Sequence, residues 1–297
     1  MGLLGGVMVP LVTPMSAPGR PAEADDLLRA LAGSGVRSLM LFGTNGEGPL
    51  LPAAALTDFA RWAVRRWREL TGGPVLCTVT AAGTAEVLER VAAVAPAGPD
   101  ALVLSPPIYF RHRPDEIAAH YAALSDVDVP VVAYNAPRYA NPLDADLVRA
   151  LAEMPHVTGV KDSSGDLGLL GEFVRVAKGR PGFEVSQGAE TKLLAALRLG
   201  ADGVVPGLAN LAPRLAVELV TAHEAGRDDD AEAAQRALDR LFALHTVRPG
   251  VPSVKAILHH RGLCAPHVAP PLAPCSDDEL RDLLALVGED AGHLLSR

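Results

Sequence analysis

One lysine of this chain stands where a lysine can act as a nucleophile. Lys161 closes the apolar segment 157–161, whereas the other three lysines fall in segments with a helical pattern: Lys178, Lys192 and Lys255. A lysine in apolar surroundings loses hydration, which favours the neutral amine. A neutral amine attacks a ketone carbonyl and forms an imine with it. The residues alone leave an alternative, an amine that reaches solvent from a strand end or pairs with Asp162.

Two hydroxyl groups come from segments that can meet this lysine. Tyr134 ends the preceding apolar segment 129–134, and its hydroxyl can pass protons to and from a substrate. A tyrosine of ordinary pKa is a poor base at neutral pH, so it needs a relay group. Thr44, after the apolar segment 38–42, can supply one. The alternative is a tyrosine that fills space and leaves its hydroxyl in water.

The turn of residues 43–48 has the composition of an anion site. Its glycines permit a tight backbone with exposed amide groups, a concavity that suits a carboxylate. Thr44, Asn45 and Gly46 are the residues that we expect to contact the substrate. The alternative is a turn that only caps the following helix, because glycine-rich turns alone are weak indicators.

Short apolar segments alternate with longer amphipathic ones through most of the chain. The apolar segments are 7–12, 38–42, 75–79, 101–104, 129–134, 157–161, 183–186 and 203–205, and helical patterns include 54–70, 84–95, 114–124 and 191–199. Continuous apolar segments are typical of parallel strands buried on both faces. Eight strands that alternate with helices predict an α/β fold, the (β/α)8 TIM barrel. An open doubly wound sheet is the alternative, but no glycine-rich turn follows the first strand.

In a barrel the active site lies at the carboxyl ends of the strands, which explains the positions selected above. The same rule adds Ser163, Gly188 and Val205 as substrate-binding candidates. Residues 227–230 are polar and are expected to separate the barrel from a tail with helices at 231–244, 252–260 and 277–286. We therefore expect a catalytic barrel over residues 1–225 and a helical extension over 226–297, packed on it.

Composition narrows the class of protein. The formal net charge of −8 argues against a nucleic-acid-binding surface. No apolar stretch approaches the ~20 residues of a membrane span. The three cysteines lack metal-site spacing, so we expect reduced thiols in a cytoplasmic protein: Cys77, Cys264 and Cys275. The histidines form no ligand cluster at strand ends, which disfavours a metal-dependent aldolase and predicts no metal.

Three motifs together resemble those of the dihydrodipicolinate synthase/N-acetylneuraminate lyase family: residues 43–47, 134–137 and 159–163. The similarity runs from about residue 6 to 286. It implies that Lys161 is the Schiff-base lysine, Tyr134 the proton-transfer residue and Thr44 its relay, and that the turn at Asn45 holds the carboxylate of pyruvate. It also implies no cofactor, and a homo-oligomer, usually a tetramer that is a dimer of dimers.

Departures from the family pattern bear on the second substrate, an aldehyde. The synthases usually carry a second threonine where this chain has Asn45, and an arginine where it has Tyr139. Arg138, one position earlier, is the candidate substitute. Tyr109 occupies the place of a tyrosine that the synthases lend across the dimer, although Ile108 replaces the preceding aromatic residue.

These departures favour a lyase that acts on 4-hydroxy-2-oxoglutarate or a 2-keto-3-deoxy sugar acid. The alternatives are 4-hydroxy-tetrahydrodipicolinate synthase, which condenses pyruvate with aspartate semialdehyde, and a sugar-acid dehydratase. A non-enzymatic regulator that binds 2-oxo acids is a further alternative. A sialic-acid substrate is disfavoured, because only Glu190 keeps an acid in the sugar-binding positions.

Overall fold

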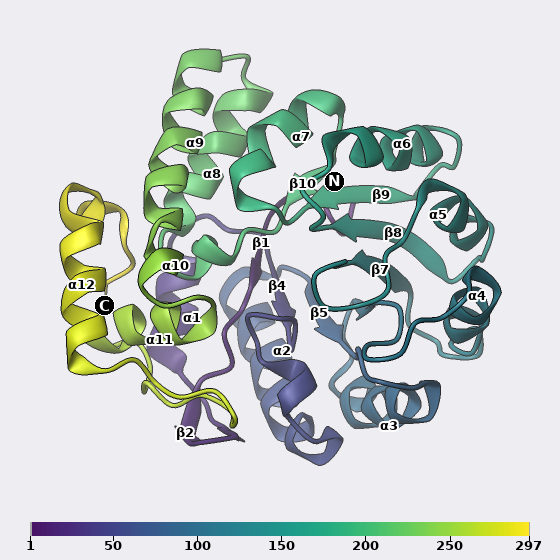
Figure 1. Ribbon diagram of the computed structural model, residues 1–297, viewed down its shortest axis with the longest axis horizontal. Helices are drawn as coiled ribbons and strands as arrows, with labels where there is room; N and C mark the ends of the chain where they lie inside the picture. Colours follow the sequence, from purple (N-terminus) through teal and green to yellow (C-terminus); the bar gives the residue numbers. More distant parts are fainter. Residues whose placement is uncertain (1, 297) are drawn as a thin grey trace.

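The computed structural model describes residues 2–296, and its centre is a closed barrel of eight parallel strands (Figure 1). Around the barrel the strands follow the order β1-β10-β9-β8-β7-β6-β5-β4. Their bounds are β1 Gly6–Pro10, β4 Ser38–Leu41, β5 Val75–Thr78, β6 Ala101–Leu104, β7 Val131–Asn135, β8 Val157–Asp162, β9 Glu184–Gln187 and β10 Gly203–Val204. The predicted TIM barrel is confirmed.

A layer of helices surrounds the strands (Figure 1). They are α1 Asp25–Ala32, α2 Thr57–Thr71, α3 Thr84–Val94, α4 Pro114–Ala122, α5 Ala145–Ala152, α6 Leu167–Lys178, α7 Leu193–Leu199 and α8 Pro213–Glu224. Two of them start later than the sequence predicts, because the 3-10 turns Ala53–Ala55 and Glu190–Lys192 precede α2 and α7. The hairpin of β2 Met15–Ala17 and β3 Arg20–Pro21 was not predicted.

Buried apolar side chains form two separate clusters. The larger cluster lies between the strands and the helices, as both-face burial of parallel strands requires. The smaller cluster fills the barrel interior: Leu4, Met8, Met40, Leu76, Ala101, Val103, Val132, Tyr134, Ala136 and Val205. The candidate site therefore borders a packed aliphatic plug, so its polar groups stand in apolar surroundings.

The chain ends in a helical extension beside the barrel, made of α9 Asp228–Phe242, α10 Leu244–Val247, α11 Val251–His260 and α12 Asp277–Val287 (Figure 1). The helix α9 begins at Asp228, before the start that we expected near residue 231, and packs along α8. Three aspartates form its first turn, where negative charge is stabilised by the helix dipole. The division at residue 226 stays a prediction.

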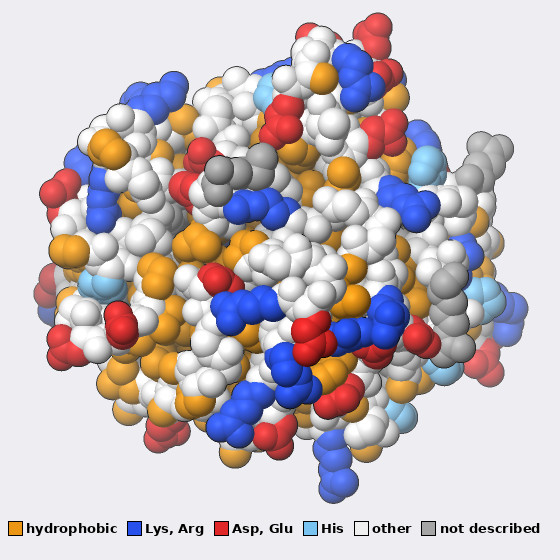
Figure 2. Space-filling view, turned by 180° about the vertical axis from the view of Figure 1, so that it is seen from behind, with side chains coloured by type: hydrophobic (Ala, Val, Ile, Leu, Met, Phe, Trp, Pro, Cys, Tyr) orange, Lys and Arg blue, Asp and Glu red, His pale blue; other side chains and the backbone are white. Residues whose placement is uncertain are grey.

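The surface mixes both signs of charge. Figure 2 shows Lys and Arg side chains interspersed with Asp and Glu side chains on one face, with hydrophobic atoms between them. Within residues 2–296, no helix is both long and apolar enough to cross a membrane. The three cysteines are free, and burial raises the pKa of Cys77 to about 12.

Candidate active site

The register of two neighbouring strands brings the lysine and the tyrosine together. Tyr134 on β7 pairs with Lys161 on β8, so the two side chains point to the same side of the sheet. Lys161 is 4% exposed and Tyr134 7% exposed. The Lys161 Nζ atom lies 4.3 Å from the Tyr134 ring centroid and 3.6 Å from Met40 Sδ. Both groups thus stand at the edge of the barrel interior.

Asp162 faces away from the lysine, since successive side chains of a strand alternate. Asn135 Nδ2 donates to Asp162 Oδ1 at 2.7 Å, and Ser164 Oγ donates to Asp162 Oδ2 at 2.9 Å. Burial raises the pKa of Asp162, although these hydrogen bonds oppose the rise. The alternative in which Lys161 serves as the partner of Asp162 is therefore wrong.

The tyrosine hydroxyl is tied to the predicted relay. Thr44 Oγ1 and Tyr134 OH lie 3.4 Å apart, and Ser163 also hydrogen bonds to the tyrosine. Burial raises the pKa of Tyr134, but the positive charge of Lys161 and the hydrogen bonds outweigh burial. The pKa of Tyr134 therefore lies below its ordinary value, which makes the phenolate more accessible for proton transfer.

The turn that carries Thr44 and Asn45 has a constrained backbone. Phe42 (φ 58°) and Glu47 (φ 56°) flank it in the left-handed region. Gly46 is needed for packing, because a Cβ there would lie 2.7 Å from Phe42 N. Within residues 2–296, the amides of Thr44 and Asn45 have no hydrogen-bond acceptor in the chain. Two unpaired amides suit a carboxylate, while substrate binding by Gly46 stays a prediction.

Two further predicted residues line the same space. A Cβ at Gly188 would lie 2.2 Å from Ser163 Oγ and 3.0 Å from Lys161 Cε, so only glycine leaves room for the lysine. Val205 is 1% exposed, belongs to the interior cluster with Tyr134, and donates its amide to Gln187 O at 2.7 Å. The structure thus places Gly188 beside Lys161, and Val205 in the same cluster as Tyr134.

The structure adds a buried acid that the predicted site did not include. Glu190 follows β9, and its carboxylate accepts hydrogen bonds from the amides of Leu208 and Gly207. Burial raises the pKa of Glu190 to about 7, although these hydrogen bonds and the charge of Lys161 oppose the rise. A Cβ at Gly207 would lie 2.9 Å from Asn45 Nδ2 and 3.2 Å from Glu190 Oε1. Glu190 therefore lies near Asn45 in the turn of residues 43–48.

His245 of α10 is the second addition. Its Nε2 lies 4.0 Å from Glu190 Oε2, and burial, with the charge of Arg138, lowers its pKa. His245 lies next to the end of a predicted helix, and nothing in the local sequence indicates that its side chain lies near the barrel. Glu190 was visible only as one acid retained from a sugar-binding pattern.

Two predicted residues lie at the rim or beyond it. Arg138 is exposed, with its guanidinium carbon 5.8 Å from the ring centroid of Tyr139, yet its charge reaches His245. Tyr109 is 87% exposed, has φ 86°, and packs edge-on against Phe110 at 4.9 Å between centroids. Within this chain, Tyr109 therefore faces solvent and not the buried lysine.

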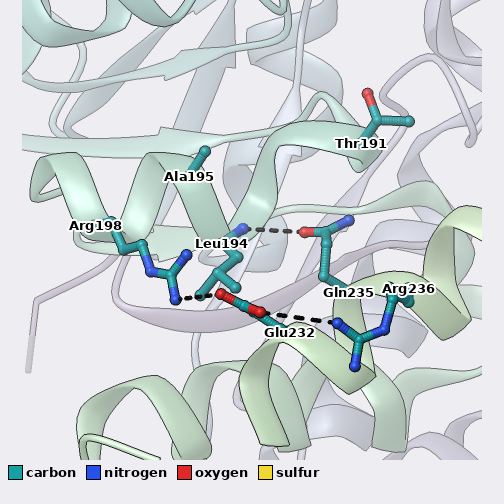
Figure 3. A pocket seen from close by; sticks show the side chains of 7 residues that line it. All are labelled: Thr191, Leu194, Ala195, Arg198, Glu232, Gln235 and Arg236. Carbon is teal, nitrogen blue, oxygen red and sulfur yellow. Dashed lines mark hydrogen bonds and ion pairs between the residues drawn. The ribbon is translucent and has the colours of Figure 1, made fainter. Parts of the chain in front are cut away.

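A separate hollow of about 320 Å³ lies on the outer side of the barrel, between α7 and α9 (Figure 3). Leu194 and Gln235 face each other across it, and Arg198 and Arg236 both pair with Glu232. Its polar groups satisfy one another, so it is not the candidate site. Within residues 2–296, no group of three or more His, Cys, Asp or Glu side chains is placed to hold a metal ion.

Known proteins are similar to this chain in sequence and in fold. The profile of the Dihydrodipicolinate synthetase family matches residues 3–289. An uncharacterised DapA-like lyase of Halobacterium salinarum is 32% identical over 93% of this chain and 90% of its own length. The 4-hydroxy-tetrahydrodipicolinate synthase of Methanospirillum hungatei is 28% identical over 94% of this chain and 98% of its own.

Solved structures agree with the sequence comparisons. YagE of E. coli K12, a prophage protein of the dihydrodipicolinic acid synthase family determined in complex with pyruvate, superposes with a TM-score of 0.90. It is 26% identical, and the match covers 96% of this chain and 98% of YagE. The profile spans nearly the whole chain, and relatives above 30% identity cover more than nine tenths of it. The chain belongs to the dihydrodipicolinate synthetase family.

Proposed function

We propose that this protein is a class I lyase that forms an imine between Lys161 and a 2-oxo acid, with pyruvate as the acid that is bound or released. The observation that carries the proposal is the buried contact of Lys161 with Tyr134, whose hydroxyl reaches Thr44. An amine, a phenol and a relay hydroxyl are the groups that carbonyl addition and dehydration require.

The steps follow from these groups. The neutral amine of Lys161 adds to the C2 carbonyl of the 2-oxo acid, and Tyr134 transfers the protons that turn the carbinolamine hydroxyl into water. The resulting protonated imine withdraws electrons from C3. When a base removes the proton of a C4 hydroxyl, the C3–C4 bond breaks, an aldehyde leaves, and the electrons form an enamine. Protonation at C3 and hydrolysis then release pyruvate and free the lysine.

The carboxylate of the 2-oxo acid fits the turn after β4. The amides of Thr44 and Asn45 have no acceptor within residues 2–296, and a carboxylate supplies two. The positive charge that Lys161 carries as an iminium lies nearby and favours the same anion. Ser163, Gly188 and Val205 border the remainder of the three-carbon unit.

The distal half of the substrate meets a different set of groups. Glu190, His245 and Arg138 come from three separate segments, and a Cβ at Gly207 would meet both Asn45 and Glu190. A carboxyl group with a pKa near 7 can accept the proton of a C4 hydroxyl at neutral pH. Arg138 can bind a second carboxylate at the rim. This set favours a hydroxylated 2-oxo acid with a distal acidic group, such as 4-hydroxy-2-oxoglutarate or a 2-keto-3-deoxy sugar acid.

The second candidate function is 4-hydroxy-tetrahydrodipicolinate synthesis, or the dehydration of a sugar acid, on the same imine. Tyr109 favours the synthase, because an exposed tyrosine of this chain is free to enter the site of a neighbouring copy. Relatives with that activity in their names are 28–30% identical to this chain. We expect a homotetramer built as a dimer of dimers, working without a cofactor in the cytoplasm.

A substrate panel separates these functions. The protein is incubated with 4-hydroxy-2-oxoglutarate, with 2-keto-3-deoxy sugar acids, or with pyruvate plus aspartate semialdehyde, and the products are measured. We expect pyruvate release from one of the first two classes. Consumption of aspartate semialdehyde alone supports the synthase, and turnover of no substrate together with retained pyruvate binding supports a regulator.

A further inference from the structure

A buried ion pair connects the turn of residues 43–48, the substrate turn of the proposed function, to the helical extension. Glu47, at the end of the turn after β4, pairs its Oε1 with Nζ of Lys255 on α11. Glu47 is 2% exposed and Lys255 0% exposed. Two backbone contacts complete the arrangement: Ala269 N donates to Glu47 Oε2 at 2.6 Å, and Lys255 Nζ donates to His267 O at 2.7 Å.

We propose that Lys255 is a positioning residue for the substrate carboxylate. Through Glu47 it holds the turn so that the amides of Thr44 and Asn45 face the 2-oxo acid. The proposal rests on the proposed function, because it assigns to these amides the carboxylate of the acid that Lys161 binds. It also makes the extension a part of the active site.

Stability gives no reason to keep this pair. Removing two charges from water costs more than their attraction returns in many proteins, and apolar residues of similar volume are often as stable or more so. Burial lowers the pKa of Lys255, as this desolvation requires, while the charge of Glu47 opposes the change. An ion pair that lowers the free energy of unfolding and lies next to the substrate turn is better explained by a role in positioning that turn.

The backbone supports the same conclusion. Glu47 has φ 56°, a left-handed conformation that an ordinary side chain adopts only when its surroundings hold it there. Contacts from two sides stabilise this conformation. Lys255 and Ala269 act on the Glu47 side chain, and the buried guanidinium of Arg90, on α3, donates to Gly48 O at 2.9 Å and to Leu51 O at 2.8 Å. The turn is thereby fixed against both the barrel helices and the extension.

The test compares single and paired substitutions. Lys255→Met alone leaves a buried carboxylate without its partner, and we expect the urea midpoint of unfolding to fall. Glu47→Met together with Lys255→Met removes both charges but leaves Ala269 N and His267 O without these partners, so we expect the midpoint to recover part of the loss. The decisive measurement is the pyruvate concentration that gives the half-maximal rate of borohydride trapping. We expect that concentration to rise at least tenfold in the double variant, with a maximal trapping rate within about threefold of wild type.

A folded double variant with the wild-type half-saturation would overturn the proposal, because the pair would then be only structural. Should the double variant not fold, Glu47→Gln keeps the side-chain size and an acceptor for Ala269, and we expect the same rise in half-saturation. Unchanged half-saturation in folded Glu47→Gln also contradicts the proposal.

Arg248→Met is the matched control. It breaks an ion pair within the extension, 3.3 Å to Glu279, without touching the turn. We expect unchanged half-saturation for pyruvate in this variant, and a rise equal to that of the double variant would overturn the proposal. If wild-type protein traps no pyruvate at any concentration, the proposed function itself fails. If the wild type traps pyruvate and the variants show the same half-saturation, only the positioning role of Lys255 fails.

Discussion

At the scale of single residues, polar groups lie against an aliphatic barrel interior. Lys161 and Tyr134 are buried at the ends of β8 and β7, so their contact is stronger than it would be in water, whereas Thr44, which the tyrosine hydroxyl reaches, is exposed. Burial raises the pKa of Tyr134, but the charge of Lys161 and the hydrogen bonds lower it by more, so the acidity of the tyrosine depends on the lysine. Substitutions here should affect chemistry more than folding.

Tyr134→Phe removes the proton-transfer hydroxyl and keeps the ring that packs beside Lys161. We expect turnover to fall by about 10²- to 10⁴-fold, the usual contribution of a positioned acid or base, with a smaller change in pyruvate binding. Steady-state kinetics on the substrate identified by the panel measures both quantities. Tyr139→Phe is the control, because the Tyr139 side chain is 56% exposed and its hydroxyl has no part in this mechanism, so the variant should keep turnover.

Gly188→Ala should inactivate the protein without unfolding it. The new methyl group would lie 2.2 Å from Ser163 Oγ and 3.0 Å from Lys161 Cε, which displaces the nucleophile. Gly171→Ala in α6 meets nothing within 4 Å, so it should keep full activity and gain about 0.5–1 kcal/mol from helix propensity. Borohydride trapping rates and urea unfolding of both variants check this. Equal trapping by the two would show that Gly188 does not border the reactive lysine.

Glu190 makes folding stability depend on pH. Its pKa rises from 4.5 to about 7 in the folded chain, so the folded state holds a proton that the unfolded state has lost between these values. The contribution of Glu190 to the free energy of unfolding, measured relative to Glu190→Gln, is greatest below pH 4.5. It declines as pH rises from 4.5 to about 7 and is constant at higher pH. The loss amounts to about 3 kcal/mol at most. Urea unfolding of both proteins at pH 5 and pH 8 measures it, and a wild type that becomes more stable relative to Glu190→Gln as pH rises would contradict the assignment.

At the scale of elements, local patterns predicted the strands well and their connections less well. Each strand is a short apolar segment, and Lys161 and Tyr134 were found because they end such segments. The pairing of Glu190 with His245 joins residues far apart in sequence, and no local pattern specifies how α10 packs against the barrel. Lys255 was placed in a helix, but its complete burial depends on Glu47 in a distant turn.

A substitution at the start of α12 tests whether the outer part of the extension affects the candidate site. Ser276 Oγ accepts from Glu279 N at 3.2 Å, and Ser276 N donates to Glu279 Oε2 at 2.8 Å, a capping box. Ser276→Ala should lower the free energy of unfolding by about 1 kcal/mol. Because the box lies away from α11's contact with the turn, pyruvate trapping should stay unchanged. Ser276→Asp should retain most of the stability.

At the scale of the whole molecule, one exposed aromatic pair indicates assembly. Tyr109 and Phe110 are 87% and 66% exposed and pack on each other, on the loop between β6 and α4. Paired exposed aromatic residues are typical of interfaces between proteins. The same loop carries Tyr109 in a left-handed conformation, which a contact with a second copy can hold.

Phe110→Asp should therefore reduce the particle mass. We expect light scattering to give an oligomer for the wild type and a smaller species for the variant, because a buried charge opposes association. Leu88→Asp, at an exposed leucine of α3, is the control and should keep the wild-type mass. A monomeric wild type, or the same mass for all three proteins, would contradict an interface at this loop.

The imine on Lys161 is tested most directly by reduction with borohydride in the presence of pyruvate, followed by mass spectrometry of the peptides. We predict one reduced pyruvate adduct per chain, located on Lys161, and no adduct in folded Lys161→Arg. An adduct on another lysine, or none on active wild-type protein, would contradict the proposed mechanism.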